Sequence, residues 1–245
     1  MTETWLILGA TSSMARAFAR HVAKGGAQVL LAGRDRDDLA ATAADAALRG
    51  APLAEVLTFD ARNPSTFDAI HDRMASLPGT LNIAVFVGSM PSQDAIDADP
   101  ALIDGMVADN FTGPIRLLHL LAPLLEARDG GTIIGVSSVA GDRGRLGNYA
   151  YGAAKAGFAT YLSGLRNRLA RSGAHVMTVK PGFVDTAMTW GLEGMFLVAS
   201  PSDVTAHMLK AAKKGRNVLY TPSFWWLIMT IINTVPEPIF KKLKI

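Results

Sequence analysis

Short apolar runs alternate with longer stretches of helical periodicity along almost the whole chain. Seven runs rich in Val, Ile and Leu are predicted strands, at 5–9, 28–32, 54–59, 82–87, 131–136, 175–180 and 217–220. Predicted helices lie between them, at 13–24, 36–49, 65–76, 101–127, 149–171 and 202–214. Strands without polar alternation are buried on both faces, as in a parallel sheet covered by helices. The sequence therefore predicts an α/β protein with a doubly wound parallel sheet of about seven strands and helices on both faces.

Composition narrows the class of protein. The chain of 245 residues is 49% hydrophobic and 18% charged, which suits one sizeable core, and no linker separates two domains. It has no cysteine, so disulfides, thiolate metal sites and cysteine nucleophiles are excluded, and a reducing cytoplasm is compatible. The five histidines lack metal-ligand spacing, and the net charge of +3 has no broad basic face for nucleic acid. The first residues lack the pattern of a signal peptide. We expect a cytoplasmic protein that binds neither metal nor nucleic acid.

The last part of the chain departs from this rhythm. We divide the sequence into a main domain at 1–222 and an apolar, basic extension at 223–245, with no charged residue from 218 to 236. The apolar part at 224–232 is too short to span a membrane. Two interpretations remain open. The extension covers a pocket or packs on a partner subunit, or it docks on a membrane with Trp225 and Trp226 in the interface and Lys241, Lys242 and Lys244 at the headgroups.

The first predicted turn has the composition of a nucleotide site. Small residues with three hydroxyls, Gly9-Ala-Thr11-Ser12-Ser13, connect the first strand to a helix. Such a turn lets a pyrophosphate approach free N–H groups at a helix N-terminus, although an ordinary capped turn has a similar sequence. Arg34 follows the second strand, where an arginine accommodates the 2′-phosphate of NADP. Asp35 directly after it leaves room for NAD.

The pair Tyr151 and Lys155 is the strongest chemical signal. Residues four apart on a helix lie on one face, and a nearby ammonium lowers the pKa of a phenol toward the working range of an acid/base. Ser137 and Ser138 close the fifth predicted strand, at the sheet edge where ligands bind. Tyr149 is a rival to Tyr151, but it lacks the four-residue spacing to Lys155.

Together these residues give the chain a resemblance to the short-chain dehydrogenase/reductase family over nearly its whole length. The matching positions are the Gly9-Ala-Thr-Ser turn, Asp60, Asn110, Ser137-Ser138, Tyr151-x-x-x-Lys155 and Pro181-Gly182 followed by Thr186. The resemblance implies a Rossmann-type domain, an NAD(P)-dependent oxidoreductase of carbonyls and alcohols, and a homodimer or homotetramer built on 101–127 and 149–171. Arg34 makes NADP the preferred cofactor, with NAD possible because of Asp35.

The resemblance also implies roles for individual residues. Tyr151 would exchange a proton with the substrate oxygen, Ser138 would hold that oxygen, Lys155 would lower the Tyr151 pKa, and Asn110 would hold a water for proton relay. Cofactor contacts are implied for Gly9, Thr11, Ser12, Ser13, Met14, Arg34, Asp60, Ala61, Gly88, Tyr151, Lys155, Pro181, Gly182, Val184 and Thr186. Two segments depart from the family pattern. The first turn has Ser13 and Ala15 in place of glycines, and Phe86-Val-Gly-Ser89 replaces an Asn-Asn-Ala-Gly sequence.

Two alternatives concern the substrate and the activity. Arg143 and Arg145 follow Ser138, and with the ending 236–245 they resemble one subgroup, the reductases of lipid-linked keto-pentose phosphates. Two guanidinium groups at this place could bind a phosphate, or they could simply be solvated. The alternative to an enzyme is a nucleotide-binding regulatory or scaffold protein without turnover, a class that usually loses the Tyr or the Lys.

Overall fold

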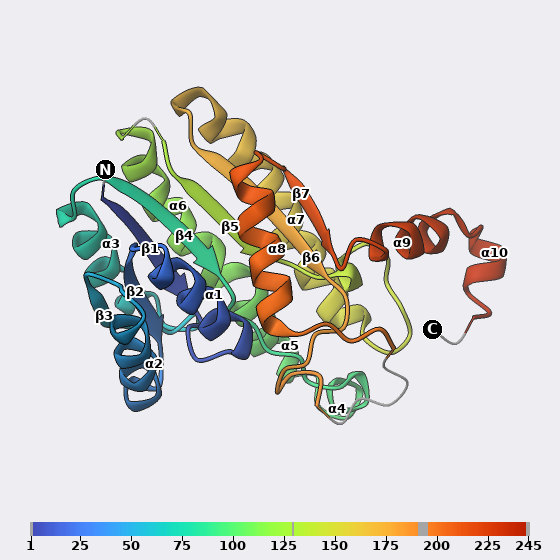
Figure 1. The fold of residues 1–245 in the computed structure, drawn as a ribbon. Helices are drawn as coiled ribbons and strands as arrows, with labels where there is room; N and C mark the ends of the chain where they lie inside the picture. The colour runs from blue at the N-terminus through green and yellow to red at the C-terminus, as the bar shows by residue number, and fades with distance from the viewer. Residues whose placement is uncertain (1, 129, 191–195, 244–245) are drawn as a thin grey trace.

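The computed structural model describes residues 2–128, 130–190 and 196–243. In these ranges the strands form one parallel sheet with the order β3-β2-β1-β4-β5-β6-β7 (Figure 1). Their bounds are β1 Glu3–Leu8, β2 Gln28–Gly33, β3 Ala54–Thr58, β4 Thr80–Val85, β5 Thr132–Val136, β6 His175–Pro181 and β7 Val218–Thr221. All seven predicted strands are confirmed, with ends that differ by one or two residues.

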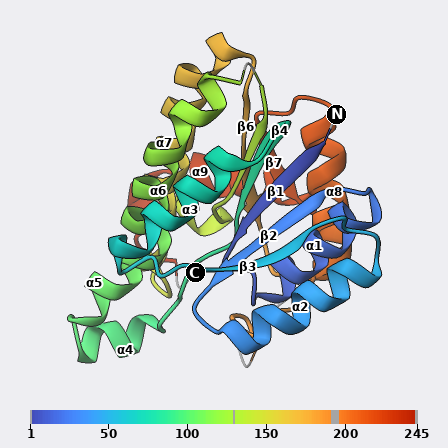
Figure 2. The ribbon, with the colours of Figure 1, turned by 90° about the vertical axis from the view of Figure 1, so that its left-hand side faces the viewer.

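Helices cover both faces of the sheet (Figure 2). One layer contains α1 (Ser13–Lys24), α2 (Arg36–Leu48) and α8 (Pro201–Lys213), and the other contains α3 (Phe67–Ser76), α6 (Gly113–Glu126) and α7 (Tyr149–Leu169). Successive strand residues serve opposite layers, because Ile7 packs in the cluster with Phe18 while Leu6 packs in the cluster with Phe158. The predicted doubly wound α/β fold is therefore confirmed.

The predicted helix at 101–127 is wrong in one respect, because it is interrupted. The chain forms α5 (Leu102–Val107), a π-helical segment (Ala108–Thr112) and then α6. Within the wide turn, Asn110 Nδ2 donates to the carbonyl oxygens of Met106 at 2.8 Å and Ser89 at 2.6 Å. Gly113 closes the segment against Ala61, whose carbonyl oxygen would lie 2.2 Å from an added Cβ. The π-helical turn thus turns Asn110 into the interior, a common use of such turns at functional sites.

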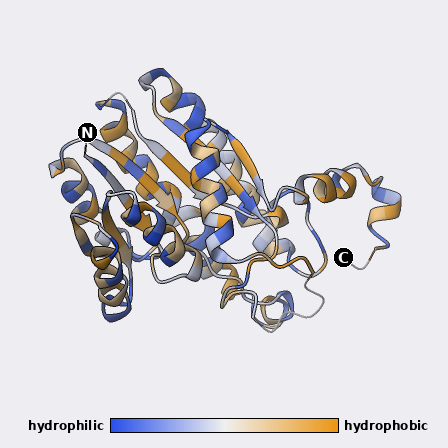
Figure 3. Ribbon diagram, in the orientation of Figure 1, coloured by the Kyte–Doolittle hydropathy of each residue, from blue (hydrophilic) through white to orange (hydrophobic). Residues whose placement is uncertain are grey.

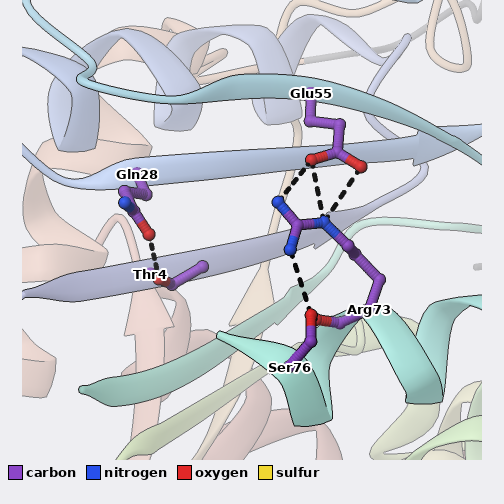
Figure 4. A network of polar contacts seen from close by, with 5 residues as sticks. All are labelled: Thr4, Gln28, Glu55, Arg73 and Ser76. Atoms are coloured by element: carbon purple, nitrogen blue, oxygen red, sulfur yellow. Dashed lines mark hydrogen bonds and ion pairs between the residues drawn. The ribbon is translucent and has the colours of Figure 1, made fainter. Parts of the chain in front are cut away.

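Ion pairing secures the sheet edge formed by β3. Arg73 of α3 donates to both carboxylate oxygens of Glu55 on β3, from Nη2 to Oε2 at 2.7 Å and from Nε to Oε1 at 3.1 Å, and also to Ser76 at 3.0 Å (Figure 4). On the neighbouring strands Thr4 donates to Gln28 at 2.9 Å. A forked Arg–carboxylate pair fixes geometry as well as charge, so α3 is tied to the edge strand.

Three helices lie outside this alternation. One is α4 (Gln93–Ala98), which was not predicted, and the others are α9 (Trp225–Thr234) and α10 (Glu237–Phe240), which extend from the body beyond β7 (Figures 1 and 3). Trp225 is only 2% exposed, whereas its neighbour Trp226 is 58% exposed. No helix in the described parts of the chain combines the length and apolarity needed to cross a membrane. The extension therefore shares features of both interpretations, with one face buried on the domain and the other open.

Candidate active site

The site begins where β1 and β4 end side by side. The order of the strands reverses between these two, and ligands of open α/β sheets bind in the crevice at such a point. Phe86 N donates to Leu8 O at 2.9 Å, which holds the two strand ends together. Gly9 has φ +75°, and an added Cβ would lie 2.7 Å from Val87 N. Only glycine satisfies both conditions, so the backbone of this turn is open to a ligand.

The turn continues into α1 through a side-chain cap. Ser12 Oγ accepts a hydrogen bond from Ala15 N at 3.2 Å, as expected for an N-cap residue. Ala15 is fully buried and does not line the cavity, so its methyl group does not obstruct the turn. Ser13 is exposed at the cavity surface. Arg16 Nε donates to Thr11 O at 3.0 Å and its other end pairs with Asp38. The two departures from glycine thus leave the turn open.

One cavity of about 690 Å³ runs from this turn across the carboxyl ends of the strands. It is lined by every residue for which a cofactor contact was predicted: Gly9, Thr11, Ser12, Ser13, Met14, Arg34, Asp60, Ala61, Gly88, Tyr151, Lys155, Pro181, Gly182, Val184 and Thr186. Ser138 also lines it, while Asn110 lies behind the wall. The structure therefore brings the predicted nucleotide turn and the predicted acid/base pair into one space.

Helix α7 carries the buried Tyr–Lys pair. Tyr151 is 7% and Lys155 4% exposed, and Lys155 Nζ lies 5.9 Å from the centre of the Tyr151 ring. Lys155 Nζ donates to Val136 O at 3.1 Å, and Ser137 Oγ donates to Lys155 O at 2.8 Å. These two bonds connect α7 to the end of β5. Ser138, the next residue, presents its hydroxyl to the cavity.

Burial dominates the ionisation of both groups. It raises the pKa of Tyr151 to about 12, and a hydrogen bond with Ser138 opposes this shift. It lowers the pKa of Lys155 to about 8. We expected Lys155 to lower the Tyr151 pKa, but in this state desolvation outweighs any such effect. The ammonium does lie close enough to favour a phenolate once further charges or hydrogen bonds enter the cavity.

Asn110 has an unused acceptor. Its Nδ2 group is fully bonded to backbone, while Oδ1 is buried and has no hydrogen-bond partner among the described residues. A Cβ at Gly88 would lie 2.6 Å from this oxygen and 3.3 Å from Lys155 Nζ. Gly88 therefore permits the amide oxygen and the ammonium to approach the same point. An unpaired buried acceptor is uncommon in native proteins and marks a place for a further donor.

The two residues that follow β2, Arg34 and Asp35, have different surroundings. Arg34 lines the cavity, whereas Asp35 does not. Asp35 is the N-cap of α2, and its Oδ1 accepts from Asp38 N at 3.1 Å. The acid is thus used for capping, and the arginine alone faces the ligand space. This arrangement favours recognition of a 2′-phosphate over that of a 2′-hydroxyl.

Tyr149, the rival to Tyr151, points elsewhere. It is 48% exposed, donates to Asp97 at 3.0 Å and is not part of the cavity wall. Asp97 also receives a hydrogen bond from Gln93 at 2.9 Å, so Tyr149 joins α7 to α4. The four-residue spacing to Lys155 thus selected the tyrosine that lines the cavity.

The two arginines after Ser138 have different environments. Arg143, predicted as a candidate phosphate ligand, instead holds the extension: it donates to Ile232 O at 2.6 Å and Val235 O at 2.7 Å, and pairs with Glu237 at 2.8 Å. Its guanidinium carbon lies 3.5 Å from the centre of the Phe240 ring. Arg145 lines the cavity. The sequence could not separate the two, because the carbonyl groups that Arg143 binds lie about ninety positions away.

Several cavity residues were not predicted. Trp225 packs so closely on Gly182 that an added Cβ would lie 1.9 Å from the indole. Beyond it the wall contains apolar and polar side chains, namely Met90, Val139, Phe183, Met188, Ser89 and Asn148. Only the cluster of aromatic residues at 224–226 gave a signal in the sequence, and that signal did not distinguish Trp225 from Trp226.

Fold and site together define a class: an α/β protein with a dinucleotide-type turn and a buried Tyr–Lys pair at the same sheet edge. Comparison with known proteins agrees. The family model of short chain dehydrogenases matches residues 3–195, so the chain belongs to the short-chain dehydrogenase family, a family of oxidoreductases.

Individual relatives extend this similarity. The chain is 29% identical over 239 residues to an uncharacterised oxidoreductase of Mycobacterium tuberculosis, covering 97% of this chain and 96% of that protein. It is 31% identical over 195 residues to a sulfoacetaldehyde reductase of Chromohalobacter salexigens, covering 77% and 75%. Among solved structures, a short-chain dehydrogenase from Sphingobium yanoikuyae in complex with NADPH has a TM-score of 0.82 and 24% identity, covering 96% and 97%.

Proposed function

We propose that the protein is an NADP-dependent reductase of a carbonyl compound, or the corresponding alcohol dehydrogenase, with Tyr151 as acid/base. One observation carries the proposal: Ser138, Tyr151 and the open Gly9 turn line the same cavity. The family supplies the reaction class.

The chain's own residues fit a dinucleotide. Gly9 leaves its turn without a side chain, Arg34 faces the cavity beside it, and Asp35 is occupied as a helix cap. A relative in fold was solved with NADPH, which agrees with this preference. When bound, the nicotinamide supplies or accepts the hydride. Asp60, Val184 and Thr186 would hold the adenine and nicotinamide ends, as the family resemblance implies.

The proton is handled by the protein. At neutral pH Tyr151 keeps its proton, because burial raises its pKa to about 12, and it is ready to give that proton to a carbonyl oxygen developing negative charge. Ser138 can donate to the same oxygen and steady it. Lys155 stabilises the resulting phenolate, since its ammonium lies 5.9 Å from the ring centre. The unpartnered Asn110 Oδ1 can accept from a water that returns a proton through Lys155.

Replacement of Tyr151 tests the proposal, with Tyr149→Phe as the matched control on the same helix. With NADPH and a panel of ketones and aldehydes, Tyr151→Phe should lower kcat by about 100- to 10,000-fold, the usual contribution of a general acid. NADPH affinity, followed by its fluorescence, should change little. Tyr149→Phe should retain activity. Equal activity of the two variants would contradict the role of Tyr151.

The same assay separates the enzyme from a nucleotide-binding scaffold. A scaffold would bind NADPH stoichiometrically, but NADPH would not be oxidised with any carbonyl compound of the panel. We favour turnover because Ser138, Tyr151 and Lys155 line one cavity, with Asn110 directly behind its wall. A homodimer or homotetramer remains a prediction, which sedimentation velocity would check.

A narrower proposal is a reductase of lipid-linked keto-sugars that contacts the membrane from one side. The supporting observation is a set of exposed apolar side chains near the site: Trp190, Phe196, Leu197, Trp226, Leu227 and Ile231. Lys241 and Lys242 follow them, while Lys244 lies outside the described residues. Arg143 no longer supports this proposal as a phosphate ligand. If this narrower proposal holds, the protein should sediment with anionic vesicles. It should also reduce a polyprenyl-phosphate keto-sugar with NADPH. Turnover of small soluble ketones alone, or an α9-dependent dimer without vesicle binding, would contradict it.

A further inference from the structure

Arg145 is a cation that lines the cavity. It is not among the residues proposed to bind the cofactor, and its buried Nε is unpaired within the described residues. Three cationic side chains line the cavity in the described part of the chain, namely Arg34, Lys155 and Arg145. Arg34 lies at the end of β2 and Lys155 is bonded to Val136. Arg145 lies in the turn that leads into α7, where Asn148 N donates to Arg145 O at 3.1 Å. It therefore stands directly before the helix that carries Tyr151.

The guanidinium has no partner among the described residues. Its Nε is buried and has no hydrogen-bond partner among these residues. Burial lowers the pKa of Arg145, although the group stays charged because an arginine does not lose its proton in proteins. A half-buried, unpaired guanidinium is unfavourable by itself and is usually matched by an anion.

The nearby carboxylates are already occupied. Among the described residues, Asp142 is the acid whose charge raises the Arg145 pKa, and its two oxygens are bonded to Lys180 and Tyr220. Among described residues of the cavity wall, the acids are Asp60 and Asp109. Asp109 pairs with Arg62 at 2.7 Å, and Asp60 Oδ1 accepts from Arg62 N at 2.9 Å. In the described ranges, therefore, no carboxylate pairs with Arg145, and the charge of Asp142 is already shared with Lys180.

Other features at this end of the cavity suit a substrate. Asn148 Oδ1 and Ser89 Oγ are also buried without partners, and they line the cavity with Arg145. The first peptide groups of α7, which begins at Tyr149, add positive potential beside the guanidinium. We propose that Arg145 binds an anionic group of the substrate, a carboxylate, phosphate or sulfonate carried by the molecule whose carbonyl is reduced at Tyr151. This inference rests on the proposed reductase function.

Matched pairs of substrates test the proposal on the protein with saturating NADPH. Each pair shares its carbonyl and differs in charge: dihydroxyacetone phosphate and dihydroxyacetone, succinic semialdehyde and its methyl ester, sulfoacetaldehyde and acetaldehyde. At least one anionic member should exceed its neutral partner in kcat/KM by about 10- to 100-fold, the usual effect of one hydrogen bond to a charged group. The pair that shows this preference identifies the anionic group as phosphate, carboxylate or sulfonate.

Variants assign the preference to Arg145. Arg145→Met should reduce the anionic-to-neutral ratio to near one, and Arg145→Lys should retain part of it, since lysine keeps the charge but loses the fork. Arg171→Met, a change of an arginine outside the cavity, should leave the ratio unchanged. A wild type that reduces neutral carbonyls without anion preference would overturn the inference. So would a preference that persists in Arg145→Met, or a loss of NADPH affinity in place of substrate affinity.

A binding measurement separates this inference from the reductase proposal. If no carbonyl is reduced, the reductase proposal fails, and the complex with NADP is titrated with glycerol 3-phosphate, succinate, isethionate and glycerol by calorimetry. Anion binding by the wild type that weakens at least tenfold in Arg145→Met would support the anion site without turnover. Equal affinities for the anions and glycerol, or equal affinities of the two proteins, would refute it. Thermal melting of both Arg145 variants confirms that they are folded.

Discussion

The indole of Trp225 packs so closely on Gly182 that a methyl group on this glycine would come within 1.9 Å of it. Trp225 comes from the C-terminal extension and Gly182 from the loop after β6, so the contact joins the extension to the cavity wall. The extension is therefore part of the site, and the boundary proposed at 222 and 223 does not separate a dispensable segment from a complete pocket.

Gly182→Ala should displace Trp225. Overpacking of this kind typically destabilises a core by about 1–3 kcal/mol, and here it should also raise the substrate KM because the cavity wall shifts. Urea unfolding and steady-state kinetics measure the two effects. The matched control is Gly164→Ala on α7, where an added Cβ meets nothing within 4 Å. That change should be neutral or stabilise by about 0.5–1 kcal/mol. Equal behaviour of the two variants would contradict the packing described.

The stability of the protein without cofactor should rise between about pH 8 and 10 because of Lys155. Its pKa is lowered to about 8 in the fold, so in this window the unfolded chain binds the proton and the folded protein does not. The burial of the ammonium thus opposes folding below pH 8, and the opposition is relieved as the pH rises. Tyr151 acts with the opposite sign above pH 10, since its raised pKa keeps a proton that the unfolded chain loses.

Lys155→Met isolates this effect. The variant should be more stable than the wild type at pH 7, by an amount on the order of 3 kcal/mol, and the difference should shrink toward pH 10. Chemical denaturation at several pH values measures it. The same variant should lose turnover, because the phenolate of Tyr151 is then unsupported. A stability difference independent of pH would show that the ammonium is not desolvated as described.

Arg143 should hold the extension in place. It donates to the carbonyls that end α9 and lies over Phe240, so Arg143→Met removes both contacts. Amide exchange in α9 and α10 should accelerate by about tenfold or more, since hydrogen bonds from a charged donor contribute about 1.5–3 kcal/mol. Mass spectrometry of exchanged peptides would show it. Glu237→Gln is the control: its carboxylate is 73% exposed, so its ion pair with Arg143 should contribute little.

Cofactor selectivity should depend on Arg34 and not on Asp35. Arg34→Ala removes a cavity-lining guanidinium and should reduce the preference for NADPH over NADH by about tenfold or more. Asp35→Asn should leave selectivity and stability nearly unchanged, because asparagine caps a helix as well as aspartate does. The dissociation constants of NADPH and NADH, measured for each variant, test this prediction. A gain of NADPH affinity in Asp35→Asn would show that the acid does face the ribose.

The sequence predicted the sheet, and the residues that it assigned to a cofactor line one cavity, for a physical reason. In a parallel sheet all strands end at one edge, so the residues that follow each apolar run, such as Gly9, Arg34, Ser138 and Pro181, must converge there. The substrate side was predicted poorly. Its residues come from loops and from the extension, and their positions depend on contacts between segments far apart in the chain.

Two pairs show this limit. Arg143 and Arg145 differ by two positions, yet one binds α9 and the other lines the cavity. Trp225 and Trp226 are adjacent, yet one is buried and the other exposed. The periodicity of a long helix at 101–127 gave no sign of the π-helical turn, because that turn is stabilised by the bond of Asn110 to Ser89 in another segment.

The end of β5 gives neighbouring serines different partners: Ser137 is buried and donates to Lys155 O, whereas the hydroxyl of Ser138 accepts from Ala140 N, and both residues line the cavity. Because side chains alternate along a strand, removal of a single residue from β5 would move Ser138 into the position that Ser137 holds and put Val139 in the position of Ser138. Such a deletion would leave the local composition almost unchanged while it moves the substrate-facing hydroxyl into the interior. The length of β5 is therefore constrained as tightly as its packing, in which an added Cβ at Gly135 would lie 2.3 Å from Leu162 Cδ1.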